Sequence, residues 1–119
     1  MDITRHHPGA RMSQISIFNR TLYLAGQVPK QTLGMDIAAQ TREVLSAVDA
    51  LLAEAGSDKS RILSCQIFLR DLADFPQMNQ VWDAWVVPGH TPPRATVQAA
   101  MATPTCNIEI VVVAAARAA

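Results

Sequence analysis

Apolar residues recur along this chain with two different spacings, which predict two kinds of regular element. Alternating or continuous apolar runs of a few residues are typical of strands, and a recurrence every three or four residues is typical of amphipathic helices. The first pattern predicts strands at residues 13–18, 21–26, 61–71, 92–100 and 107–116. The second predicts helices at residues 36–55 and 74–86, and no element is predicted before residue 13.

Turn and capping residues mark the ends of several predicted elements. Asn19 and Arg20 form a two-residue hairpin signal between the first two strands. Asp36 is suited to the N-cap of the long helix, and Gly56 to the position just after its end. Asp74 is the expected cap of the second helix.

The order of these elements is ββαβαββ, which predicts an α+β fold with both helices on one face of the sheet. The strand at 61–71 is expected to turn Leu63, Cys65, Ile67 and Leu69 toward the core. Trp82 and Trp85 of the second helix are expected in the core rather than as a platform for a ligand. The last strand is apolar on both faces apart from one carboxylate. The uncovered sheet face therefore also needs burial, and association with copies of the same chain is the simplest source of it.

Length and composition then exclude several classes of protein. The 119 residues are expected to form a single domain, residues 1–119. Ten basic and ten acidic side chains give a net charge of zero, which favours neither nucleic acid nor an anionic membrane surface. No apolar run approaches the roughly 18 residues of a membrane helix, and the first residues lack the apolar centre of a secretory signal.

The cysteines and histidines do not form a metal-binding pattern. Cys65 and Cys106 lie far apart and are expected to be reduced thiols in a cytoplasmic protein. His6 and His7 are adjacent, but no further ligands stand at a useful spacing, so no metal site is expected.

Two charged residues stand in strands that are otherwise apolar. Arg94 opens the strand at 92–100 with a charge that it cannot lose, and one interpretation places it in solvent at a strand end. Glu109 lies between Ile108 and Ile110, where an unpaired carboxylate is costly. It either pairs with a cation that fixes the strand register, or acts as a general base or a holder of water.

The strands that carry Arg94 and Glu109 are joined by the short connection 101–106 and are expected to be antiparallel neighbours. The two side chains would then lie close together at one end of the sheet. Such a pair would suit a small anionic substrate, because Arg94 can grip a carboxylate in two hydrogen bonds while Glu109 positions or deprotonates water.

Five segments resemble, in order and spacing, the RidA/YjgF/UK114 family of reactive-intermediate imine deaminases, and together they cover essentially the whole chain. The most specific are the PxRxxV pattern that begins at Pro92-Pro93-Arg94 and the Glu-Ile pair at Glu109. The others are LAGQVP and the helical segments at 36–62 and 68–86.

This resemblance implies a chorismate-mutase-like fold, a homotrimer with three clefts between subunits, and no metal or organic cofactor. The family's carboxylate-binding arginine falls on Arg94, and its water-positioning glutamate falls on Glu109. The backbone N–H groups of Gly26 and Thr96 would help to hold the ligand. The implied chemistry is hydrolysis of enamines and imines, such as 2-aminoacrylate, to 2-keto acids and ammonia.

Three candidate substrate-binding positions depart from the family pattern. Met12 stands where the best-characterised deaminases have tyrosine, and Ala25 stands where they have serine. At Thr96 the family often has cysteine or serine. Carboxylate binding by Arg94 is expected to be intact, whereas any role of the two missing hydroxyls is unfilled.

Two functional hypotheses follow. The first is a homotrimeric imine or enamine hydrolase that removes reactive metabolites. The alternative is a trimer that binds small carboxylates without turnover, which the residues at 12 and 25 motivate. A chaperone-like or translation-inhibiting ribonuclease role has been attributed to some family members, but zero net charge and the lack of a basic, aromatic face argue against RNA.

Overall fold

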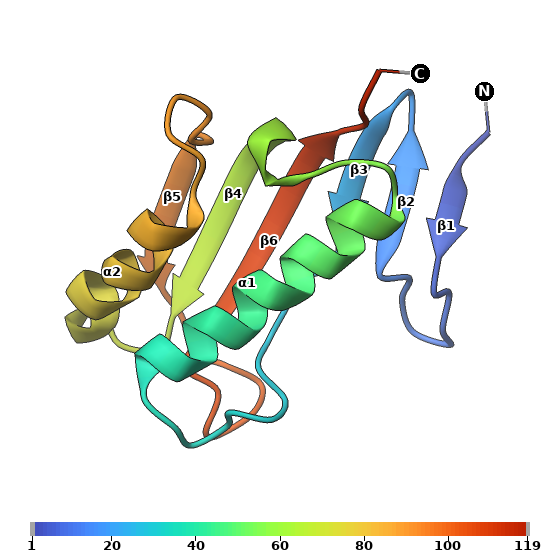
Figure 1. The fold of residues 1–119 in the computed structure, drawn as a ribbon. Helices are drawn as coiled ribbons and strands as arrows, with labels where there is room; N and C mark the ends of the chain where they lie inside the picture. The colour runs from blue at the N-terminus through green and yellow to red at the C-terminus, as the bar shows by residue number, and fades with distance from the viewer. Residues whose placement is uncertain (1, 119) are drawn as a thin grey trace.

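One six-stranded mixed sheet and two α-helices make up residues 2–118, which the computed structural model describes (Figure 1). The strands are β1 (Thr4–His6), β2 (Ile15–Phe18), β3 (Thr21–Leu24), β4 (Ile62–Leu69), β5 (Arg94–Gln98) and β6 (Ile108–Ala115). The α-helices are α1 (Ile37–Glu54) and α2 (Phe75–Trp85), and two short 3-10 turns are η1 (Lys59–Arg61) and η2 (Leu72–Asp74).

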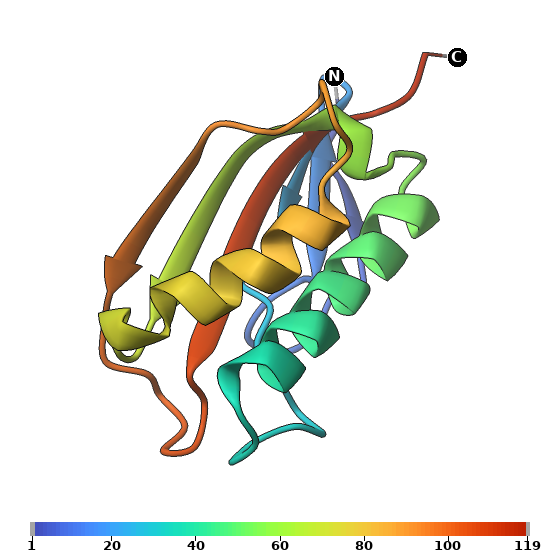
Figure 2. The same cartoon turned by 60° about the vertical axis from the view of Figure 1, so that its left-hand side comes forward.

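Both helices pack on the same face of the sheet, as Figure 2 shows, so the predicted α+β architecture is confirmed. The core lies between the helices and this face. Its fully buried side chains include Ile15, Leu22, Val44, Leu45, Val48, Leu52, Ile67, Leu69, Met78, Ile108 and Ile110. Trp82 is also buried there, as predicted, whereas Trp85 is half-buried and packs against the core. No helix within residues 2–118 is long and apolar enough to cross a membrane.

Strand β1 was not predicted, so the observed order begins with three strands rather than two. Its three residues carry no apolar alternation. The strand pairs with β2 and is tied down by polar contacts, because His6 Nδ1 and His7 Nε2 lie 2.6 and 2.8 Å from the two carboxylate oxygens of Glu54 on α1. These histidines therefore anchor an edge strand.

The strands lie in the order β1-β2-β3-β6-β4-β5, and only β4 and β5 pair in parallel. The expectation that β5 and β6 are neighbours is wrong, because β4 separates them. Helix α2 connects β4 to β5, which pairs with the outer side of β4. The loop after β5 then passes the end of β4 before β6 begins. Arg70 holds that loop through Nε to Cys106 O at 2.9 Å and through a terminal nitrogen to Thr103 O at 2.7 Å.

Local sequence signals explain the ends of α1 and the hairpin. Asp36 accepts a hydrogen bond from Ala39 N at 2.9 Å, as an N-cap does. Gly56 follows the helix with φ of +79°, a backbone region that glycine enters without strain. Asn19 and Arg20 have φ of 51° and 61°, which is the geometry of a tight turn between β2 and β3.

Two local predictions are corrected. Asp74 occupies the N-cap position of α2, but its side chain makes no capping hydrogen bond. Leu63 is 49% exposed, and Ile62 is buried instead, because a shift of register between Ile62 and Ser64 turns the start of β4 over. The predicted inward residues Cys65, Ile67 and Leu69 are buried.

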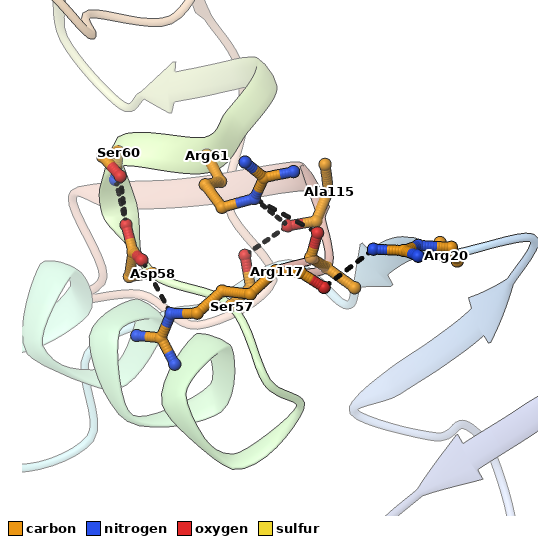
Figure 3. Close-up of polar contacts among 8 residues, drawn as sticks. Arg20, Ser57, Asp58, Ser60, Arg61, Ala115 and Arg117 are labelled. Atoms are coloured by element: carbon orange, nitrogen blue, oxygen red, sulfur yellow. Dashed lines mark hydrogen bonds and ion pairs between the residues drawn. The ribbon is translucent and has the colours of Figure 1, made fainter. Parts of the chain in front are cut away.

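The end of β6 is held in the sheet by side chains from three other segments (Figure 3). Ala115 O accepts from Ser57 Oγ at 2.6 Å and lies 3.3 Å from Arg61 Nε. Arg20 donates to Arg117 O at 2.8 Å. The last strand is therefore fastened at its end as well as along both sides.

Candidate active site

Glu109 lies on the face of β6 that the helices leave uncovered. Its neighbours Ile108 and Ile110 are fully buried on the helix side, so the alternation of the strand turns Glu109 the other way. The side chain is half-buried, and no hydrogen bond or ion pair within residues 2–118 engages its carboxylate. It borders a cavity of about 210 Å³, together with Phe68 and Met101. The carboxylate is thus free to act on a bound molecule.

Gly26 lies against this carboxylate at an irregular point in the β3–β6 pairing. Tyr23 pairs with Val113 and Gln27 with Ile110, so the β3 side carries one extra residue. Such a bulge re-aims the local backbone and is frequent beside active sites. A β-carbon at Gly26 would overlap Glu109 Oε2 and lie 2.8 Å from its Cδ.

One free donor, the backbone N–H of Gly26, completes this part of the site. The flanking amides are used, because Ala25 N donates to Gln14 O at 2.9 Å and Gln27 N donates to Ile110 O at 2.8 Å. The Gly26 N–H makes no such backbone hydrogen bond within the described chain. A hydrogen-bond donor and a carboxylate therefore stand side by side.

Arg94 begins β5, the edge strand, and its side chain is fixed against α2. One terminal guanidinium nitrogen donates to Asn79 Oδ1 at 2.8 Å. The guanidinium carbon lies 5.0 Å from the ring centre of Trp82 and 5.6 Å from that of Phe75, within the range of cation–π contact. The half-buried cation is therefore held rigidly, and the interpretation of a side chain free in solvent is wrong.

Cys65 lies beside Arg94 in the sheet register but is not a nucleophile. Burial raises the pKa of the Cys65 thiol to about 12, although the nearby charge of Arg94 acts in the opposite direction. At neutral pH the group stays protonated, and a thiol reacts through its thiolate.

Thr96 presents its backbone N–H to the free edge of the sheet. Ala99 N donates to Leu69 O on β4 at 3.0 Å, and successive residues of a strand point their amides to opposite sides, so the amide of Thr96 faces away from β4. Thr96 Oγ1 is buried and has no hydrogen-bond partner within residues 2–118. The edge amide is therefore available near Arg94, whereas the hydroxyl oxygen is shielded from solvent.

Within one chain, Arg94 and Glu109 do not meet. They lie on strands separated by β4, and their side chains leave opposite faces of the sheet, since Arg94 contacts α2 while Glu109 faces away from both helices. The sequence shows that both charges lie in strands. It does not show that β4 separates these strands, or toward which face of the sheet each side chain points.

The remaining predicted positions lie on the Glu109 side of the sheet or in the turn before β2. Ala25 directly precedes Gly26 and is half-buried. Met12 lies between β1 and β2 and is 59% exposed. Sequence reasoning missed Asn79, which orients Arg94. Its place one residue after buried Met78 and three before buried Trp82 was the available signal that it lies toward the sheet.

The described residues offer no cluster of side chains suited to bind a metal ion. No group of three or more His, Cys, Asp or Glu side chains within the described residues is arranged to hold a metal ion.

Comparison with known proteins places this arrangement in a family. The family model Endoribonuclease L-PSP matches residues 3–116. A RutC family protein of Haemophilus influenzae is 50% identical over 114 residues, which are 96% of this chain and 98% of the relative. The 3-aminoacrylate deaminase RutC of Acinetobacter baylyi is 43% identical over 79 residues, which are 66% of this chain and 62% of that protein.

A solved structure matches over the same extent. The crystal structure of a YjgF family member from Neisseria meningitidis superposes with a TM-score of 0.96 at 43% identity, covering 100% of this chain and 98% of that one. The family model, the sequence of the full-length relative and the fold agree. The chain therefore belongs to the YjgF/RidA family, as its Arg94 and Glu109 segments had predicted.

Proposed function

We propose that this protein hydrolyses small imines or enamines that carry a carboxylate, releasing a 2-keto acid and ammonia. The observation that supports it best is the Glu109 carboxylate, which is half-buried beside the Gly26 backbone and a cavity of about 210 Å³ but engaged by no partner in the described chain. A relative similar over 66% of this chain is named 3-aminoacrylate deaminase, which is the same class of chemistry.

The proposed reaction needs little beyond orientation and water. Arg94 binds the substrate carboxylate in two hydrogen bonds, and its contacts with Asn79 and Trp82 keep the fork in place before substrate arrives. Glu109 accepts a proton from a water molecule as the water oxygen attacks the imine carbon. Glu109 then returns that proton to the nitrogen of the tetrahedral adduct. The C–N bond breaks, the hydroxyl proton of the adduct passes to the leaving nitrogen, and ammonia leaves as the carbonyl of the keto acid forms.

Arg94 and Glu109 can serve one substrate if they come from two copies of the chain. Arg94 stands at the open edge of the sheet, next to the outward-facing Thr96 amide, whereas Glu109 stands on the uncovered face. A second copy that lays its uncovered face against the β5 edge of the first would bring the two groups to one cleft. We propose that the active assembly is a homotrimer with such clefts between subunits.

The test is keto-acid and ammonia release from 2-iminopropionate generated in the assay, with semicarbazide as a competing trap for the imine. We expect the wild type to accelerate hydrolysis over buffer. Glu109→Gln should lower the rate roughly 10²- to 10⁴-fold, because it keeps the side-chain shape and removes the basic oxygen. Glu54→Gln, on the far end of α1, is the matched control and should leave the rate unchanged.

Wild-type protein that gives no acceleration with this imine or with larger imino acids would refute the proposal. A Glu109→Gln variant with full activity and lowered stability would instead show that the carboxylate only supports the fold.

A second candidate is a carboxylate-binding protein without turnover. It is favoured by the residues at positions 12 and 25, where methionine and alanine supply no hydroxyl to orient water. In that case 2-keto acids would bind through Arg94, and imine hydrolysis would stay at the buffer rate.

A further inference from the structure

The cavity of about 210 Å³ beside Glu109 has a charged side and an apolar side. Strand β6, which carries Glu109, lies between β3 and β4. On the β3 side the Glu109 carboxylate lies against Gly26, where an added β-carbon would lie 2.8 Å from the carboxylate carbon. The group that acts on water in the proposed reaction therefore stands at one side of the cavity rather than at its centre.

The side of the cavity toward β4 and β5 is apolar. Phe68 of β4 pairs directly with Glu109, so both side chains project from the uncovered face of the sheet and lie next to each other. Ala99, Ala100 and Met101 follow the end of β5 and complete the lining. Phe68 and Met101 are half-buried and so keep part of their surface available. Among the lining residues of the described chain, Glu109 is the one with a charge.

The cavity is larger than the attack of water requires. A water molecule takes up about 30 Å³ in the liquid, so the cavity has roughly seven times the volume of the attacking water. The imine carbon and its nitrogen fill only part of the remainder. The space over Phe68 and Met101 is left for a further part of the substrate.

The charges decide which part of the substrate lies there. In the proposed reaction the substrate carboxylate binds Arg94 of a second copy, and the imine carbon faces the water at Glu109. The third group, the side chain on the imine carbon, then lies over Phe68 and Met101. A negative side chain there would be repelled by Glu109 and desolvated without a partner. A positive one would pair with the Glu109 carboxylate and draw it from the attacking water.

We propose that this apolar side selects imines whose carbon carries an apolar side chain larger than methyl, such as isobutyl. Phe68, Ala100 and Met101 are the residues that determine this specificity, because an apolar side chain gains from burial against them. The inference rests on the proposed function and names the substrate class of that same site.

The experiment compares 2-keto acids that differ in the side chain, titrated into the intact protein by calorimetry. Pyruvate has a methyl group, 4-methyl-2-oxopentanoate an isobutyl group, 2-oxoglutarate a negative side chain and 5-guanidino-2-oxopentanoate a positive one. We expect the isobutyl acid to bind about tenfold more tightly than pyruvate, because discrimination in an apolar pocket starts at roughly tenfold for one methylene. Both charged acids should bind at least tenfold more weakly than the isobutyl acid, on the order of the same discrimination.

Variants test the assignment through the ratio of the affinities for the isobutyl acid and for pyruvate. Ala100→Leu fills the apolar side, and Met101→Gln makes it polar at nearly the same length, so each should bring the ratio close to one. Ala102→Leu is the matched control, because Ala102 is an exposed alanine of the same loop outside the cavity lining, and it should leave the ratio as in wild type. Sedimentation of each variant checks its assembly.

Four results would overturn the proposal. The first is a wild-type ratio near one, or no binding of the isobutyl acid at millimolar concentration. The second is equal or tighter binding of either charged acid. The third is the same fall of the ratio in Ala102→Leu as in Ala100→Leu. The fourth is an Ala100→Leu variant that loses its assembly and keeps its ratio, because a second copy rather than substrate would then fill the cavity.

The calorimetric readout separates this proposal from the proposed function, because it measures binding without turnover. If the preference for isobutyl is present but no imine is hydrolysed, the apolar subsite stands and the hydrolase proposal falls. If 2-iminopropionate and 2-imino-4-methylpentanoate are hydrolysed with equal kcat/KM, the hydrolase proposal stands and this one falls.

Discussion

The space that a side chain at Gly26 would occupy is filled by the Glu109 carboxylate. In Gly26→Ala the new methyl group must push away the far end of a flexible side chain rather than backbone. We therefore expect a small loss of stability, about 1 kcal/mol or less, but a large loss of imine hydrolysis, because the displaced carboxylate no longer meets the water. Urea unfolding and the imine assay on the same sample check the two effects.

A matched glycine helps to interpret that result. Gly34→Ala places a methyl group in open space, although its φ of +81° makes the substitution strained. It should lower stability and leave the rate per folded molecule unchanged. If Gly26→Ala behaved in the same way as Gly34→Ala, Glu109 would not be acting from its observed position.

Arg94 is rigid because α2 supports it, and this makes a graded prediction possible. Arg94→Lys keeps the charge but loses the fork, so binding of pyruvate or 2-ketobutyrate should weaken sharply, and Arg94→Ala should abolish binding. Loss of a desolvated charge partner typically costs roughly 2–5 kcal/mol, or about 30- to several-thousand-fold in affinity. Asn79→Ala should weaken binding by a smaller factor, roughly tenfold, because it removes one hydrogen bond to the guanidinium.

Calorimetric titration of the keto acid into these variants is the measurement, with the imine assay alongside. As a positioning residue, Asn79 should affect KM more than kcat, and Asn79→Asp should restore part of the affinity. Equal affinity in wild type and all Arg94 variants would remove this arginine from the ligand site.

At the scale of the elements, helix α1 fixes the loop that follows Gly26 by means of a single carboxylate, that of Glu43. Glu43 accepts from the Thr32 hydroxyl at 2.6 Å and from the backbone N–H groups of Lys30, Gln31 and Thr32 at about 3 Å. The Thr32 hydroxyl has the largest effect on the pKa of Glu43, burial opposes it, and each amide lowers the pKa further by a smaller amount, so that the pKa falls from 4.5 to about 2.

This lowered pKa sets a pH dependence of stability. A carboxyl group with a lower pKa in the folded than in the unfolded state stabilises the fold above its unfolded value and loses that effect as pH falls. Glu43→Gln should therefore cost about 1 kcal/mol at pH 7, and the difference from wild type should vanish as pH falls from 4.5 toward 2. Urea unfolding at several pH values and one protein concentration tests this, and a constant difference would exclude the carboxylate as its source.

The hydrophobic pattern predicted most elements because their apolar positions face one core. It predicted α1 with its caps, α2, and the strands β2 to β6. Three features of the fold have no corresponding pattern of apolar residues in the sequence. Strand β1 depends on the pair of histidines at Glu54 rather than on apolar alternation. At the start of β4 a shift of register exposes Leu63, and no residue type in the sequence predicts this shift.

The third feature is the position of β6 between β3 and β4. A short connection suggested that β5 and β6 pair, but strand order is decided by which partner buries each face best, and β6 is apolar enough to take the centre. For the site, the two charges could be selected from the sequence because each breaks an apolar run. Their opposite directions, and the support that Asn79 gives, depend on packing across the sheet.

At the scale of the whole molecule, the uncovered sheet face remains to be accounted for. It exposes apolar side chains on several strands, among them Tyr23 at 49% and Val97 at 43%. Exposed apolar patches of this kind commonly mark protein interfaces. With the cleft geometry proposed for Arg94 and Glu109, this face is the expected contact between three copies.

Sedimentation in dilute buffer should then give about three times the mass of the chain. Tyr23→Glu should shift the protein toward monomer and lower imine hydrolysis in parallel, since each cleft would lose one side. Met35→Glu changes an apolar residue of similar exposure, 54%, beside the start of α1 and should leave the assembly intact. A monomeric wild type with full activity would contradict both the interface and the shared cleft.

The position of β6 has a consequence for how the protein is made. Strand β6 follows the other five described strands in the sequence and lies between β3 and β4. The middle of the sheet is therefore synthesised after the other five strands. Until then β3 and β4 each present an unpaired edge to other nascent chains. Correct assembly of the sheet must wait for β6, so slow synthesis of residues 108–115 would prolong the interval in which the chain is most prone to aggregate.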